Sequence, residues 1–164
     1  MPEGYYERES IVHLDGSPVF QNALDRAIED EVADYVAKKG SEKHGEAGKL
    51  SVVRFAPLCP IDWYAERYDR MVGLLELKSP REPMGAHKNV LLNVRKWLAL
   101  TMGATGLGVP AIFVVRWNDG NVRWLPLSRI DASKHRIGGC KRIVKSAADI
   151  EPVIEVPVDS MRVL

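Results

Sequence analysis

Apolar and polar residues recur with two different periods in the first half of the chain. Residues 22–39 carry apolar side chains at helical spacing and are followed by Gly40, so this segment is predicted to form a helix that ends there. Three shorter segments are rich in the β-branched, aromatic and leucine residues that are typical of strands: residues 50–56, 61–67 and 72–78. A tight turn separates the last two, which therefore form a predicted hairpin.

The second half of the chain repeats this alternation of helix and strand. A helix is predicted over residues 87–102, with a buried stripe of Leu91, Val94, Leu98 and Met102. A glycine-rich connector follows this helix and precedes a strand, which is the reverse of a dinucleotide-binding loop. Further strands are predicted at residues 109–117, 121–127 and 151–158, and residues 128–150 are basic and irregular.

These elements predict a single α/β domain. The chain has 164 residues, of which 46% are hydrophobic and 27% charged, as in an ordinary globular domain with its own core. The predicted order is helix, three strands, helix and strand. No apolar run is long enough to span a membrane, and the acidic N-terminus does not resemble a secretory signal. We therefore expect a cytoplasmic protein without a membrane partner.

The strongest chemical signal lies in the predicted hairpin. Side chains alternate between the two faces of a strand, so Glu76 and Lys78 share one face while Leu75 and Leu77 share the other. Asp62 begins the neighbouring strand, from which its carboxylate can reach the same place. Two carboxylates can hold a hard cation such as Mg²⁺, which stabilises charge on a phosphate and acidifies a bound water. A nearby lysine stabilises the transition state or positions that water.

This arrangement resembles the signature of the PD-(D/E)XK nucleases, in which an Asp precedes a Glu-x-Lys on adjacent strands. Here the motif reads PID at residues 60–62 and ELK at residues 76–78, and the residue between Pro and Asp is a mild departure. The order of the predicted elements also resembles that family, over residues 22–117 as a core with residues 118–164 as an extension. The resemblance, which extends to small phage proteins, implies a restriction-endonuclease-like core: a central mixed sheet of four to five strands flanked by helices. It also implies a deoxyribonuclease with Mg²⁺ or Mn²⁺ as cofactor, bound by Asp62, Glu76 and the carbonyl of Leu77.

The first helix offers a further carboxylate. Glu31 lies within about 20° of Leu24 on a helical wheel, inside the predicted apolar stripe, whereas Glu29 and Asp30 fall outside it. A carboxylate on a core-facing stripe needs a partner, because burying an unpaired charge is costly. Many PD-(D/E)XK nucleases place a glutamate of this helix at the metal site, so the resemblance implies a catalytic and metal-binding role for Glu31. Pairing with a basic neighbour is the other explanation.

The distribution of basic residues favours a nucleic-acid partner. The net charge is only +1, but residues 78–96 hold five basic residues against one acidic, and residues 129–145 hold six against one. PD-(D/E)XK nucleases often place a lysine or glutamine of the second helix near the scissile phosphate. We expect Lys96 to take this place, with Arg95 as the second choice. Weaker candidates for phosphate contacts follow the motif strand: Ser79, His87 and Lys88.

The cysteines and histidines form no metal-binding pattern. Cys59 and Cys140 are far apart and are expected to be reduced thiols, and the remaining histidines are isolated: His13, His44 and His135. The sequence therefore predicts a metal-dependent endonuclease or exonuclease with DNA as its partner. Two alternatives stay open. One is a structure-selective nuclease such as a Holliday-junction resolvase, which implies a homodimer, and the other is a non-catalytic relative that binds DNA or a protein.

Overall fold

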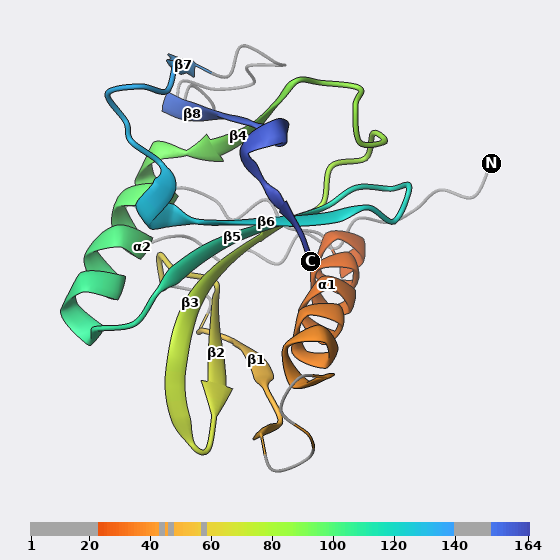
Figure 1. Ribbon diagram of the computed structural model, residues 1–164, viewed down its shortest axis with the longest axis vertical. Coiled ribbons are helices and arrows are strands. Elements are labelled where there is room, and N and C mark those ends of the chain that lie inside the picture. Colours follow the sequence, from red (N-terminus) through yellow and green to blue (C-terminus); the bar gives the residue numbers. More distant parts are fainter. Residues whose placement is uncertain (1–22, 43–44, 46–47, 57–58, 140–151) are drawn as a thin grey trace.

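The computed structural model describes residues 23–42, 45, 48–56, 59–139 and 152–164 (Figure 1). Its centre is a six-stranded sheet in the order β1-β2-β3-β5-β6-β9. These strands span Ser51–Arg54 (β1), Trp63–Arg67 (β2), Arg70–Lys78 (β3), Ala111–Arg116 (β5), Val122–Pro126 (β6) and Arg162–Val163 (β9). Strands β3 and β5 are parallel and the other pairs are antiparallel, which confirms the predicted mixed sheet. The sheet is wider than the four to five strands expected.

A second sheet and two main helices complete the architecture (Figure 1). The second sheet is antiparallel, in the order β4-β8-β7, with strands Asn89–Asn93 (β4), Ile137–Gly139 (β7) and Pro152–Pro157 (β8). The helices are Ala23–Glu42 (α1) and Val94–Leu107 (α2), and two short 3₁₀ turns span Leu127–Arg129 (η2) and Val158–Ser160 (η4). Residues after 117 thus add strands to both sheets. No described helix is long and apolar enough to cross a membrane.

Strand β3 separates two apolar cores. Leu75 and Leu77 are buried on the face covered by α1, and Leu74 is buried on the opposite face, where α2 packs. Because side chains alternate along a strand, Glu76 and Lys78 lie on the same face as Leu74. The charged residues of the motif therefore point toward the α2 side of the sheet.

The predicted hairpin is confirmed as β2 and β3. Its tip consists of Tyr68 and Asp69, which both have left-handed backbone conformations with φ of 53° and 55°. Two such residues in succession are typical of the two-residue turn whose twist matches that of antiparallel strands. A bulge between Ala65 and Glu66 then shifts the register by one residue, so that Trp63 lies opposite Leu75 at the end of the hairpin that carries Asp62 and Glu76.

The predicted second helix is wrong at its start. Residues 89–93 form β4, because this leucine-rich run pairs with β8, and α2 begins only at Val94. Asn93 ends the strand and caps the helix, since its side-chain oxygen accepts a hydrogen bond from the Arg95 backbone N–H at 2.8 Å. The predicted apolar stripe is also wrong: Leu98 is 46% exposed and Met102 72% exposed, whereas Leu100 is fully buried.

The other boundaries differ less. Helix α1 continues past Gly40 to Glu42. Helix α2 continues into the glycine-rich connector and ends at Gly108, which adopts a left-handed conformation with φ of 67°, as expected for a helix C-cap. The strands predicted at 109–117, 121–127 and 151–158 are confirmed as β5, β6 and β8. The basic region contains η2 and β7, and its part from residue 140 onward lies outside the described residues.

Two glycines of α2 give a test of how closely this helix packs on β3. A Cβ atom at Gly103 would lie 2.9 Å from Cδ1 of Ile61 and 3.0 Å from Cδ1 of Leu74, while a Cβ at Gly106 would meet nothing within 4 Å. We expect Gly106→Ala to raise the free energy of unfolding by a few tenths of a kcal/mol through helix propensity. Gly103→Ala should be about 1 kcal/mol less stable than Gly106→Ala, because it crowds the core. Denaturant unfolding of both variants measures this difference, and equal stabilities would contradict the close packing.

Candidate active site

The β2–β3 hairpin brings Asp62 and Glu76 together. Trp63 pairs with Leu75 across the two antiparallel strands, so the next position on each strand places Asp62 opposite Glu76. Both side chains lie on the α2 face of the sheet, and each carboxylate is close enough to influence the other electrostatically. The structure thus assembles the two motif carboxylates as the sequence predicted.

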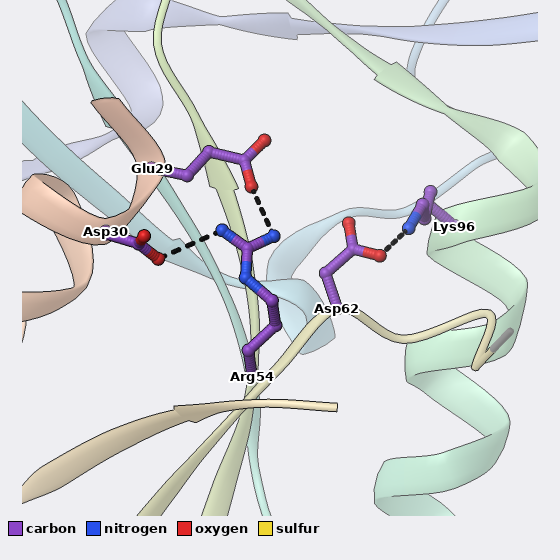
Figure 2. A network of polar contacts seen from close by, with 5 residues as sticks. All are labelled: Glu29, Asp30, Arg54, Asp62 and Lys96. Carbon is purple, nitrogen blue, oxygen red and sulfur yellow. Dashed lines mark hydrogen bonds and ion pairs between the residues drawn. The ribbon is translucent and has the colours of Figure 1, made fainter. Parts of the chain in front are cut away.

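Two lysines approach these carboxylates from different elements. The Nζ atom of Lys96, on α2, lies 2.5 Å from Oδ1 of Asp62 and forms an ion pair with it (Figure 2). Lys78, at the end of β3, donates a hydrogen bond of 2.5 Å to the backbone carbonyl of Leu91 in β4. The positive charges of both ammonium groups also lower the pKa of Glu76. Lys96, expected beside the phosphate, is therefore at the carboxylate cluster itself.

Glu76 is the most perturbed acid in the described part of the chain. Its Oε2 atom is buried and has no hydrogen-bond partner. Burial raises the pKa of Glu76 from 4.5 to about 7; the cation of Lys96 opposes this rise, Asp62 adds to it, and Lys78 and Glu29 have smaller effects in opposite directions. A buried carboxylate oxygen without a partner is costly unless a proton or a cation satisfies it.

Helix α1 presents Glu29 to this cluster, and not Glu31 as the helical wheel predicted. The side chain of Glu31 is 67% exposed and pairs with Arg116 at 3.1 Å, which matches the alternative explanation of a basic partner. Glu29 is 21% exposed and acts electrostatically on Glu76. The predicted position of Glu31 in the apolar stripe is therefore wrong.

The reason is that the buried face of α1 differs from the apolar stripe that the sequence predicts. The buried face of α1 is formed by Val32, Ala33 and Val36. Measured from Val32, Glu29 lies at about 60°, between Val36 and Ala33, whereas Glu31 lies about 100° away on the other side. Leu24, which defines the predicted stripe, lies about 80° from Val32 on the wheel. The predicted stripe is therefore rotated away from the buried face, which places Glu31 inside it and Glu29 outside.

Arg54 is a second residue that the sequence did not single out. It ends β1, and its guanidinium binds Glu29 and Asp30 of α1 (Figure 2). One arginine in a short strand gives no sequence signal of this kind, because its partners are more than twenty residues away. It lies between the glutamate of α1 and the hairpin that carries Asp62.

The predicted phosphate-binding residues lie on the loop after β3 and at the start of α2. Ser79 directly follows Lys78, and its buried Oγ has no hydrogen-bond partner. His87 and Lys88 are exposed in the loop between β3 and β4, and Arg95 is exposed in the first turn of α2. Their positions do not test whether these residues bind DNA, which stays a prediction.

The loop that carries His87 and Lys88 is held by the turn between β5 and β6. The Met84 backbone N–H donates to Oδ2 of Asp119 at 3.0 Å, and the Asn118 side-chain amide donates to the carbonyl of Arg81. Partial desolvation raises the pKa of Asp119, but hydrogen bonds from Asn121 and from the Met84 backbone N–H hold it below its ordinary value. The exposed basic side chains therefore project from a fixed loop.

The donor set suits a hard divalent cation. Among the residues that the structure describes, no three His, Cys, Asp or Glu side chains are arranged closely enough to form a metal site by themselves. Glu76, with its unpartnered Oε2, nevertheless lies opposite Asp62, and Mg²⁺ is usually held by only one or two carboxylates together with waters and substrate phosphates. The residues present therefore fit such an ion.

Comparison with known proteins identifies the family. A family model described as "Phage putative PDDEXK endonuclease" matches residues 16–164. The chain belongs to this family. The assignment confirms the resemblance to PD-(D/E)XK nucleases and the predicted nuclease function. No curated protein sequence matches the chain.

A solved structure confirms the fold class. The chain is similar to Hjc of Archaeoglobus fulgidus, a Holliday junction resolvase from an archaeal hyperthermophile, with a TM-score of 0.51 and 14% sequence identity. The match covers 82% of this chain and 89% of that chain. At this identity the likeness shows the fold alone, and it confirms the predicted restriction-endonuclease-like core.

The raised pKa of Glu76 predicts how stability depends on pH. Between pH 4.5 and about 7 the unfolded chain releases the Glu76 proton while the folded chain keeps it, so the stability provided by the neutral carboxyl is lost over this range. Glu76→Gln removes this loss. Without divalent cations, we expect the variant to gain up to about 3 kcal/mol over the wild type between pH 4.5 and pH 8. Denaturant unfolding in EDTA across this range measures the gain, and parallel pH profiles for both proteins would contradict it.

Proposed function

We propose that the chain is a metal-dependent deoxyribonuclease that hydrolyses phosphodiester bonds with Mg²⁺ or Mn²⁺ as cofactor. The observation that carries this proposal is the convergence of Asp62, Glu76, Lys78 and Lys96, with a buried oxygen of Glu76 left without a partner. Membership of a nuclease family supports the reaction type.

Two carboxylates of the hairpin would hold the cation. Asp62 and Glu76 provide side-chain oxygens, and the carbonyl of Leu77 is the backbone donor that the family resemblance implies. Glu29 replaces Glu31 as the contribution of α1, because it lies on the buried face of the helix and acts on Glu76. A bound divalent cation supplies charge neutralisation at the phosphate and a more acidic water.

The lysines have different positions and so different proposed roles. The contact of Lys78 with the Leu91 carbonyl fixes its ammonium at the end of β3, where it can stabilise charge on the phosphate or orient the attacking water. Lys96 shares Asp62 with the cation and limits the repulsion between the carboxylates. A bound cation would therefore compete electrostatically with Lys96 for the Asp62 carboxylate.

A structure-selective nuclease is the second candidate function. The similarity in fold to Hjc, which is a Holliday junction resolvase, favours it, and it would require a homodimer to cut two strands of a junction. Cleavage assays on linear, nicked, branched and single-stranded DNA, combined with measurement of the mass in solution, separate this candidate from a general nuclease. Binding of DNA without any cleavage would point instead to a non-catalytic relative.

Substitutions in the cluster test the proposed roles. We expect Asp62→Asn, Glu76→Gln and Lys78→Ala each to lower the rate of DNA cleavage by at least about 100-fold, because each removes a group that acts on the reacting phosphate or its cation. Single-turnover cleavage in Mg²⁺ measures the rates. Retained cleavage by Glu76→Gln would contradict the metal site.

Glu29 and Glu31 provide a matched pair, because both are glutamates of α1 that pair with an arginine. Glu29→Gln should weaken Mn²⁺ binding about tenfold, as expected when a carboxylate that supports a metal site is lost. Glu31→Gln should leave Mn²⁺ affinity and cleavage unchanged. Isothermal titration calorimetry with Mn²⁺ measures both variants, and the reverse result would restore Glu31 to the site.

DNA affinity should depend steeply on salt if the basic surface contacts phosphates. Lys88 is exposed on the fixed loop after β3, so Lys88→Gln should weaken binding to all sequences alike and reduce the slope of log affinity against log salt by about 0.9 for duplex DNA. Binding is measured in Ca²⁺ by fluorescence anisotropy. Lys38→Gln is the control, because Lys38 is exposed on α1 outside the proposed DNA surface; the same change of slope in both variants would refute the assignment.

A further inference from the structure

We propose that Arg54 is a positioning residue of the active site, which fixes the carboxylate of Glu29 on α1 next to the hairpin that carries Asp62 and Glu76. This inference rests on the proposed metal site, since Glu29 is its contribution from α1. Arg54 itself touches neither of the motif carboxylates through any contact that the structure records among the described residues. Its proposed action passes through Glu29.

The guanidinium of Arg54 links β1 to α1 by two separate contacts. Its Nη1 atom lies 3.1 Å from Oε2 of Glu29, and its Nη2 atom lies 3.0 Å from Oδ1 of Asp30 (Figure 2). The two carboxylates belong to consecutive residues, so the planar fork of the arginine can be held in one orientation. Glu29 is the more buried partner, with 21% exposure against 61% for Asp30. The inner contact, between Arg54 and Glu29, is therefore less screened by solvent than the outer contact, between Arg54 and Asp30.

The same guanidinium packs on Trp63. Its central carbon lies 4.2 Å from the centroid of the ring, and the two residues are direct partners across β1 and β2. Trp63 is only 3% exposed and directly follows Asp62 in the chain. Stacking on a fixed ring restricts the guanidinium and adds a cation–π attraction. Arg54 thus ties Glu29 to the strand that presents Asp62.

Such a tie is needed because the carboxylates repel one another. Glu29 and Asp62 both disfavour the charged form of Glu76. A partly exposed glutamate on a helix can reduce this repulsion by rotating its side chain toward solvent. The hydrogen bond from Arg54 opposes that rotation and holds one oxygen of Glu29, and Figure 2 shows the other oxygen pointing away from Arg54.

Removal of Arg54 distinguishes positioning from simple charge repulsion, because the two effects have opposite signs. A cation near a metal site repels Mn²⁺, so its loss alone would tighten Mn²⁺ binding. Loss of a residue that orients Glu29 weakens Mn²⁺ binding instead, by about tenfold. We expect Arg54→Ala to show the weaker binding in calorimetric titrations of the full chain with Mn²⁺. Unchanged or tighter binding would overturn the inference.

A double-mutant cycle tests whether Arg54 acts through Glu29. If it does, Arg54→Ala should cause little further loss of Mn²⁺ affinity in a chain that already carries Glu29→Gln. The same tenfold loss in both backgrounds would overturn the inference, because Arg54 would then act independently of Glu29. Asp30→Asn is the matched control: it removes the outer contact alone and should change Mn²⁺ affinity less than twofold.

Arg54→Lys covers the case in which Arg54→Ala does not fold. Lysine keeps the positive charge but lacks the fork that binds Glu29 and Asp30 together. We expect several-fold weaker Mn²⁺ binding with a retained melting transition, and wild-type affinity would overturn the inference. Glu76→Gln distinguishes failure of the proposed metal site from failure of the proposed role of Arg54. If this variant binds Mn²⁺ as tightly as the wild type, the proposed metal site fails. If Glu76→Gln loses binding but the Arg54 variants do not, only the role of Arg54 fails.

Discussion

The carboxylate of Glu76 is the constraint on which the site depends. It stands on a central strand, on a face otherwise occupied by the buried Leu74 and the helix that covers it. A charged carboxylate in that position is unfavourable unless cations surround it. Lys78 and Lys96 supply positive charge from β3 and α2, while Asp62 and Glu29 increase the negative charge. The site is therefore a balance of opposite charges that a substrate phosphate and its cation can shift.

The sheet allows this balance because β3 contributes buried side chains to the apolar cores on both of its faces. Its leucines at positions 75 and 77 anchor α1, and Leu74 together with the close approach at Gly103 anchors α2. Both helices are thus fixed relative to the same strand. Glu29 and Lys96 come from these two helices, so their distances to Glu76 are set by apolar packing and not by the polar contacts alone.

The sequence predicted the parts of the structure that depend on local pattern. Alternation along β2 and β3 was enough to place Asp62, Glu76 and Lys78 on one face. The start of α2 could not be predicted in this way, because Asn89–Asn93 becomes a strand only by pairing with Pro152–Pro157. Similarly, no local pattern connects Arg54 with Glu29, and apolar residues near the start of α1 predict a stripe that is rotated away from the face buried by Val32, Ala33 and Val36.

The two lysines show why the motif alone does not define the site. Lys78 belongs to the motif, and its contact with the Leu91 carbonyl orients the ammonium without itself neutralising it. Lys96 lies outside the motif, yet it binds Asp62 directly. Since a cation that binds Asp62 competes with this pair, the affinity of the site for metal depends on α2 as well as on the hairpin. The strand β4 contributes to both lysines, because it supplies the Leu91 carbonyl and ends at the Asn93 cap from which α2 begins.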